Sequence, residues 1–293
     1  MVDTYRYNVT DPEEKSQAVN KERLQVTTPP NSPNAKHDPE FPAPGVFVEE
    51  ALRCAKEAQA KGIQLRVLGG LAIYLHSKNE EALWKSLGRL GEKVFTDIDF
   101  MSRKADVPKI VDMLKGMGYT CNEAFLLLRG DTRLIFYGNP VPMIDVFVDK
   151  LDFCHTIDLS KRLDVDYPTI PLADLLLEKL QIVQLNEKDV KDTVVLLKAH
   201  NLGEVDKDAI NIGYIAELLS KDWGFYYTAT TNLGKIKEYV SKSDTLNSYR
   251  TDLSEKIDKI NQRIESEPKT TGWKMRAKVG TRKKWYQDVG EVT

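Results

Sequence analysis

Thr96-Asp97-Ile98-Asp99-Phe100 is the stretch that decides the fold of this chain, together with Gly69-Gly70 before it and Ile144-Asp145-Val146-Phe147 after it. Acidic and apolar residues alternate in this stretch. Because the side chains of a strand point alternately to its two faces, Asp97 and Asp99 are predicted to share one face. Their apolar neighbours then face a core.

Asp145 lies in a second predicted strand, Val141–Val148, where it faces away from its apolar neighbours. If this strand pairs with the first, Asp97, Asp99 and Asp145 converge. Three hard oxygen ligands suit Mg²⁺ or Mn²⁺, which keep waters and use substrate phosphates to complete their shell. Carboxylates on adjacent strands can also bridge two ions about 3.5–4 Å apart. The pattern therefore predicts phosphoryl chemistry.

Gly69-Gly70 follows a predicted strand, Ile63–Leu68, and opens a predicted helix, Leu71–Ser77. Backbone N–H groups at such a turn can hold an anion. Glycine also occurs at strand-to-helix turns for steric reasons alone. Gly69 and Gly70 are therefore candidate phosphate-binding residues, with a purely steric role as the alternative.

Read in order, Val-Leu-Gly-Gly-Leu-Ala, Thr-Asp-Ile-Asp-Phe and Ile-Asp-Val-Phe resemble the nucleotidyltransferase superfamily typified by DNA polymerase beta. The resemblance is closer to the bacterial and archaeal nucleotidyltransferases of the abortive-infection toxin type, and covers roughly residues 46–201. It implies transfer of a nucleoside monophosphate from a nucleoside triphosphate such as ATP. Two Mg²⁺ or Mn²⁺ ions would be held by Asp97, Asp99 and Asp145. The acceptor would be an RNA, a protein or a small molecule, and the partner a cognate antitoxin.

Two later features also resemble that family. Lys179 matches its lysine-bearing helix, where the lysine faces the nucleotide, and Asp189 and Asp192 match its later acidic pair, three residues apart on one helix face. Without the resemblance, each is an ordinary solvated helix face. The family usually has a basic residue just before Thr96, whereas Lys93 is the nearest base here. Arg89 and Lys93 are candidate phosphate contacts, although a solvated loop charge is the simpler interpretation.

The predicted fold class is α+β, with a small mixed sheet flanked by helices and followed by a helical domain. No Gly-x-Gly-x-x-Gly turn follows a strand, which excludes a Rossmann fold. Phe125–Arg129 and Arg133–Tyr137 are predicted to add strands. The predicted parts are a flexible, proline-rich N-terminal tail (1–44), a nucleotidyltransferase core (45–160), a helical domain (161–266) and a basic, aromatic C-terminal tail (267–293).

Composition is ordinary for a globular protein: 293 residues, 29% of them charged, with a net charge of −2. This balance argues against a globally basic nucleic-acid binder. Three widely spaced cysteines predict a reducing compartment, and no apolar run reaches the length of a membrane span. We expect a cytoplasmic protein without membrane contact.

The basic and aromatic residues after Lys269 suit phosphate contact and base stacking on RNA. The alternative is a tail that docks on its own protein. A second hypothesis for the whole chain is a nucleotide- or RNA-binding protein that keeps the fold without turnover. The missing base before Thr96 favours it, and the three aspartates oppose it.

Overall fold

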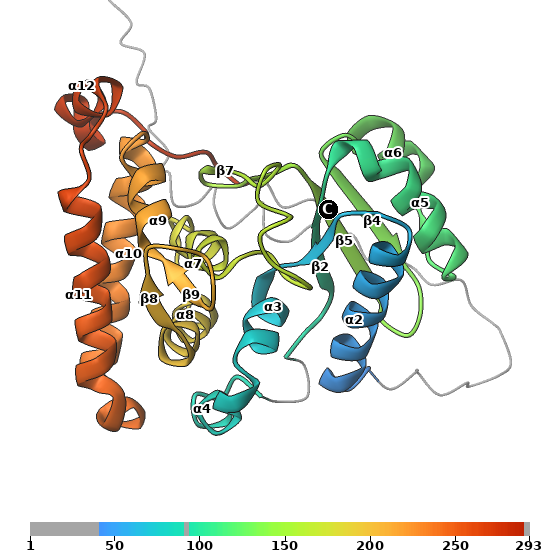
Figure 1. The fold of residues 1–293 in the computed structure, drawn as a ribbon, viewed down its shortest axis with the longest axis horizontal. Coiled ribbons are helices and arrows are strands. Elements are labelled where there is room, and N and C mark those ends of the chain that lie inside the picture. The colour runs from blue at the N-terminus through green and yellow to red at the C-terminus, as the bar shows by residue number, and fades with distance from the viewer. Residues whose placement is uncertain (1–40, 91–93, 290–293) are drawn as a thin grey trace, which may run out of the picture. The chain divides into compact units, whose positions relative to one another are not determined.

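The three sequence pieces meet on one five-stranded mixed sheet in a computed structural model of the chain (Figure 1). Its strands are β1 (Leu65–Val67), β2 (Ile98–Ser102), β3 (Thr120–Cys121), β4 (Arg133–Tyr137) and β5 (Met143–Val148). Their order is β1-β2-β5-β4-β3, with β2 and β5 parallel and the other neighbours antiparallel. Asp99 pairs with Asp145 in register. The two aspartate-bearing strands therefore pair, which is the condition stated for convergence of their carboxylates.

One face of this sheet packs into the hydrophobic core. Ile98 and Phe100 on β2 and Ile144 and Val146 on β5 have no exposed surface, as their alternation predicts. The same apolar cluster includes residues of α2 (Pro44–Ala60) and α5 (Val107–Gly116). Asp99 and Asp145 alternate with these core residues along β2 and β5. Their side chains therefore point to the other face of the sheet. The predicted fold class, a small mixed sheet flanked by helices and followed by helices, is confirmed.

The remaining elements are short strands and helices. Two helices, α3 (Gly69–His76) and α4 (Glu81–Ser86), connect β1 to β2. Two hairpin strands follow the sheet, β6 (Lys150–Asp152) and β7 (Thr156–Asp158). The helical part consists of α7 (Leu172–Leu180), α8 (Glu187–Ala199), a parallel strand pair β8 (Asn201–Gly203) and β9 (Ala209–Asn211), α9 (Ile212–Leu219), α10 (Trp223–Lys242), α11 (Arg250–Ser266) and α12 (Thr271–Val279).

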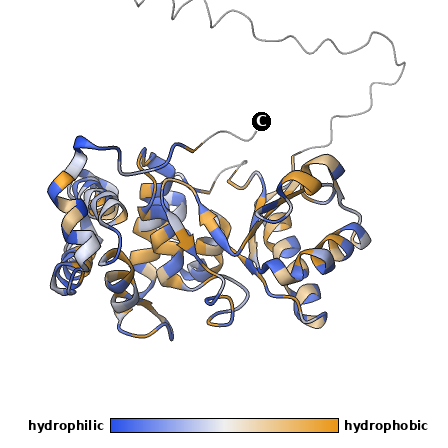
Figure 2. Ribbon diagram, turned by 90° about the horizontal axis from the view of Figure 1, so that it is seen from above, coloured by the Kyte–Doolittle hydropathy of each residue, from blue (hydrophilic) through white to orange (hydrophobic). Residues whose placement is uncertain are grey.

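Amphipathic stripes hold the helical part together. Helix α11 packs against α9 and α10. Its apolar stripe is fully buried and consists of Leu253, Ile257, Ile260 and Ile264. Figure 2 shows apolar residues interleaved with hydrophilic ones along these helices. Helix α9 starts at Ile212, because the Asn211 side chain accepts a hydrogen bond from the Tyr214 N–H and caps the helix there.

The strand predicted at Phe125–Arg129 is wrong, because this segment forms a helix, α6 (Glu123–Arg129). The Asn122 side chain accepts hydrogen bonds from the N–H groups of Ala124 and Phe125, at 2.9 and 3.2 Å. Glu, Ala, Leu and Arg are strong helix formers, and the run of three leucines lacks the alternation of a strand. The cap and the local propensity together explain the helix.

The structure describes residues 41–90 and 94–289, which form one compact unit. Most of the predicted N-terminal tail, and Lys93, lie outside the described residues. The domain boundaries predicted near residues 160 and 266 stay predictions. Among the described helices, none combines the length and apolar character that a membrane crossing requires.

The C-terminal segment packs on α10 through its aromatic residues. The Trp285 indole N–H donates to Thr228 Oγ1 at 3.1 Å, and its ring meets Tyr227 edge-on. The Arg276 guanidinium lies over the Trp223 ring, 4.8 Å from its centroid. These contacts agree with the prediction of a tail that docks on its own protein, and they leave Lys274, Lys278, Arg282 and Lys283 exposed.

Candidate active site

Asp97, Asp99 and Lys179 line one cavity of about 160 Å³. Asp97 lies just before β2, where its Oδ1 accepts a hydrogen bond from the Thr96 hydroxyl at 3.1 Å. Asp99 is the second residue of β2. Lys179 comes from α7, so a helix far along the chain closes the cavity over the strand end. Its volume is below the roughly 300–1,000 Å³ of pockets that enclose drug-sized ligands, and suits a phosphate group better than a whole nucleotide.

Gly69 lies directly against Asp99. Its φ is +74°, in the left-handed region that favours glycine, and a Cβ there would lie 3.0 Å from Asp99 Oδ2. Its N–H donates to Glu178 Oε2 at 3.0 Å. This N–H is therefore used by the protein, and its predicted contact with a phosphate stays a prediction. Gly70 lines the cavity itself.

Negative charge accumulates at Asp99. Burial raises the pKa of Asp99 well above its usual value, and the neighbouring carboxylates of Asp97, Asp145 and Glu178 raise it further. Lys179 opposes this effect. A carboxyl with too little compensating positive charge is what a bound divalent cation would stabilise.

Lys179 is held by a cluster of carboxylates. Its Nζ donates to Asp189 Oδ1 at 3.1 Å and lies 3.6 Å from Asp192 Oδ2 and 3.8 Å from Glu178 Oε1. Burial acts to lower the pKa of Lys179, but these three carboxylates outweigh it and raise the pKa. The side chain is only 9% exposed, so the alternative of a solvated helix face is wrong for Lys179.

Arg89 also faces this cavity. Its Nε donates to Asp192 Oδ1 at 2.7 Å and its Nη2 to Asp192 Oδ2 at 3.1 Å, a bidentate pair that fixes the guanidinium. The Arg89 side chain is largely buried and lies 5.7 Å from the Trp84 ring centroid. The simpler interpretation of Arg89 as a solvated loop charge is therefore wrong.

Asp145 pairs with Asp99 on the sheet but is bonded to Arg133. Arg133 Nε donates to both Asp145 oxygens, at 3.0 and 2.9 Å, and Nη2 also donates to Oδ2. Asp145 is 2% exposed. Burial raises the pKa of Asp145, while Arg133 acts to lower it. Arg133 is absent from the sequence prediction.

Whether a metal ion fits this site depends on which side chains can donate oxygen ligands to it. Within the described residues, no three His, Cys, Asp or Glu side chains are grouped closely enough to hold a metal ion. Asp97 and Asp99 nevertheless face one cavity, and Asp99 carries the charge imbalance that a cation would relieve. These two carboxylates fit one divalent cation whose remaining ligands are water and phosphate oxygens, as Mg²⁺ prefers.

The sequence predicts the strand that carries Arg133, but not its register with the strand of Asp145. In the structure, residues 138–142 connect β4 to β5, and Arg133 pairs with Phe147. Because same-face neighbours are two residues apart, this register brings Arg133 diagonally to Asp145. Glu178 and Arg89 have no comparable local signal, since their partners lie 109 and 103 residues away.

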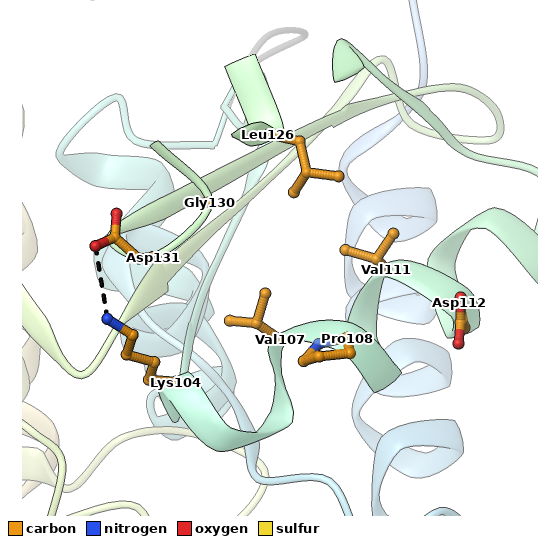
Figure 3. A pocket seen from close by; sticks show the side chains of 8 residues that line it. All are labelled: Lys104, Val107, Pro108, Val111, Asp112, Leu126, Gly130 and Asp131. Carbon is orange, nitrogen blue, oxygen red and sulfur yellow. Dashed lines mark ion pairs between the residues drawn. The ribbon is translucent and has the colours of Figure 1, made fainter. Parts of the chain in front are cut away.

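A larger cavity, of about 500 Å³, lies between α5 and α6 (Figure 3). Val107, Val111 and Leu126 give it apolar walls, and the Lys104–Asp131 ion pair, 3.5 Å between Nζ and Oδ2, lies at one edge. It contains none of the predicted site residues. The smaller cavity, which is lined by charged side chains, is therefore the candidate active site.

Neither a protein-family model nor a curated protein matches this chain. Among solved structures, an antigenic nucleotidyltransferase-like protein from Paracoccidioides brasiliensis is similar with a TM-score of 0.36 and 11% identity, over 78% of this chain and 97% of that one. The Megavirus polyadenylate synthase is similar with a TM-score of 0.30 and 14% identity, over 75% of this chain and 45% of that one. At this distance, the geometry of the site carries the functional argument.

Proposed function

We propose that this protein is a metal-dependent nucleotidyltransferase that moves a nucleoside monophosphate from a nucleoside triphosphate to an acceptor. One observation carries the proposal: Asp97, Asp99 and Lys179 line a single phosphate-sized cavity. The described residues lining it include four aspartates and three basic residues, Arg89, Lys179 and Lys188. A polyphosphate would be repelled by this excess of carboxylates. Its binding therefore requires a divalent cation between Asp97, Asp99 and the phosphate oxygens.

In the proposed reaction, a hydroxyl oxygen of the acceptor attacks the α-phosphorus. A new oxygen–phosphorus bond forms, the bond from that phosphorus to the bridging oxygen breaks, and pyrophosphate leaves. Asp97 and Asp99 anchor the cation, and Lys179 orients the phosphates. Asp145 is the carboxylate that we assign to help take the proton of the attacking hydroxyl. A bound Mg²⁺ would neutralise the charge that develops on the phosphate oxygens.

The finer assignment is to a toxin of the abortive-infection type, acting with a cognate antitoxin. Its support is the grouping of Lys179 with Asp189 and Asp192, the residues that carry that resemblance in the sequence. We propose an RNA acceptor, with ATP as one candidate donor. The exposed basic side chains of the C-terminal segment are the proposed contact for RNA phosphates.

Calorimetric titration of the full chain with each nucleoside triphosphate, with and without Mg²⁺, tests the proposal. We expect binding that requires Mg²⁺ and is lost in Asp97→Asn. The matched control is Asp164→Asn, which removes an exposed carboxylate from an ion pair with Arg103 and should bind as the wild type does. Equal binding without the metal, or no binding of any triphosphate, would contradict the proposed site.

One observation favours a second candidate, a nucleotide-binding protein without turnover. Both oxygens of Asp145 are bonded to Arg133, which weakens Asp145 as a base. Pyrophosphate release separates the two candidates. The transferase releases pyrophosphate when given a triphosphate, Mg²⁺ and a cell extract that contains the acceptor, whereas the binding protein holds the triphosphate and releases none.

A further inference from the structure

Arg133 places a positive charge directly against the Asp145 carboxylate. Three N–H···O contacts join the guanidinium to the Asp145 carboxylate, and they use both oxygens. A carboxylate that binds a metal ion must offer an oxygen lone pair toward it. In this geometry, both oxygens of Asp145 already accept hydrogen bonds from Arg133.

Arg133 is also held in place by a contact that does not involve Asp145. Its guanidinium lies 5.0 Å from the centroid of the Phe147 ring, directly across from it in the β4–β5 register. Phe153 packs edge-on against the same ring at 5.3 Å. The aromatic support and the strand pairing fix the guanidinium on the aspartate-bearing face of the sheet.

The charge balance of the site is consistent with Arg133 lying beside Asp145. Asp97, Asp99 and Asp145 together carry three negative charges when ionised, and an arginine stays protonated in proteins. One divalent cation at Asp97 and Asp99, with the single positive charge of Arg133 at Asp145, balances these three carboxylates. A second divalent cation at Asp145 would lie next to a permanent positive charge.

We propose, resting on the proposed function, that the Arg133 guanidinium takes the place of the Asp145-bound ion, so that the site binds one divalent cation at Asp97 and Asp99 instead of two. Arg133 is then a positioning residue. It neutralises Asp145 and fixes the orientation of this carboxylate, and it makes the site a one-metal variant of a two-metal arrangement.

Counting Mn²⁺ bound to the full chain, by equilibrium dialysis with electron paramagnetic resonance detection of free Mn²⁺, tests this inference. We expect one ion for each wild-type chain, none for Asp97→Asn, and two for Arg133→Gln, which frees the Asp145 oxygens while keeping a polar side chain. The matched control is Arg103→Gln, which breaks an arginine–aspartate pair with Asp164 elsewhere on the molecule and should keep one ion.

Two ions on the wild-type chain would overturn the inference and leave the proposed function standing. A single ion on a folded Arg133→Gln protein would also overturn it. The wild-type count alone decides the question if Arg133→Gln does not fold. No Mn²⁺ on wild type or variant would remove the metal site, and with it both the proposed function and this inference.

Discussion

At the scale of single residues, Asp99 and its neighbours concentrate charge where the fold gives little compensation. Because burial and the carboxylates of Asp97, Asp145 and Glu178 raise the pKa of Asp99 above its usual 3.8, the folded protein binds this proton more readily than the unfolded chain. The contribution of Asp99 to stability is therefore highest below about pH 4, and falls as the pH rises through the raised pKa. Above the raised pKa and without a metal ion, the ionised Asp99 carboxylate destabilises the fold.

Asp97→Asn and Asp99→Asn each remove a charge that a hard divalent cation needs, while keeping the shape of the side chain. We expect nucleotidyl transfer to fall by orders of magnitude in both, and the melting temperature of Asp99→Asn without Mg²⁺ to equal or exceed that of the wild type. Thermal unfolding with and without Mg²⁺, beside a transfer assay, measures both effects. Full activity in both variants would show that the site is assigned to the wrong residues.

Gly69→Ala tests the close approach of the turn to Asp99. Alanine at a φ of +74° is strained, and its Cβ would lie 3.0 Å from Asp99 Oδ2. We expect the free energy of unfolding to fall by about 1–2 kcal/mol. Gly45→Ala is the control, since Gly45 has nothing within 4 Å of the added Cβ and should keep wild-type stability. Equal stabilities for the two variants, measured by urea unfolding, would rule out this strain.

The local pattern predicts some site residues and cannot reach others. The alternation around Asp97 and Asp99 gives the strand and its core face, because these depend on a period of two. The pairing with the strand of Asp145 is seen only in the structure. The Arg89–Asp192 pair joins residues 103 positions apart. No local periodicity encodes such a contact, because it exists only after α8 has packed against α3.

At the scale of elements, α6 and the C-terminal segment show where local sequence patterns mislead and where they succeed. A segment with three consecutive leucines suits a strand or a helix, and the Asn122 cap decides for the helix. For the tail, the sequence predicts either RNA binding or docking on its own protein. Its tryptophans pack on α10 while most of its basic side chains stay exposed, so the two roles fall on different residues.

This division predicts different effects for two sets of tail variants. Changing the exposed Lys274, Lys278 and Lys283 to Gln should leave the melting temperature unchanged and weaken RNA binding. The slope of log affinity against log salt should become shallower by about 0.7 for each RNA phosphate that the variant no longer neutralises. Trp285→Ala should instead lower the melting temperature, because it removes the interactions with Tyr227 and Thr228. An unchanged RNA affinity and salt slope in the triple variant would exclude RNA binding by these side chains.

At the scale of the whole molecule, the site depends on a connection between the sheet and the helical part. The Val67 N–H donates to Pro168 O at 2.9 Å, and the Ile170 N–H donates to Val67 O at 3.0 Å. The segment before α7 therefore runs beside β1, and α7 brings Glu178 to the Gly69 N–H and Lys179 to the cavity. Pro168 and Pro171 lie in this segment, and proline is uncommon inside a central strand. The sequence therefore indicates a domain boundary here and does not predict that the segment pairs with β1.

Buried histidines make the whole fold sensitive to acid. His155 stacks on Phe225 and bonds to Thr228 Oγ1 at 2.8 Å, and burial lowers its pKa to about 4. Since the unfolded value is about 6.5, this stabilising contribution is complete above that pH and is lost as the pH falls toward 4. Urea unfolding from pH 7.5 to 4.5 should show a shallower loss of stability in His155→Gln than in the wild type. Parallel curves would contradict the buried, neutral state of His155.

The central claim is that Asp97 and Asp99 support transfer of a nucleotide, and labelled transfer tests it most directly. The full chain is incubated with each nucleoside triphosphate labelled at the α-phosphate, with Mg²⁺ and with total cell RNA or protein. We predict label on one acceptor class with at least one triphosphate, dependent on Mg²⁺ and absent in Asp97→Asn and Asp99→Asn. Label that persists in both variants, or no label with any triphosphate in either acceptor pool, would contradict the account.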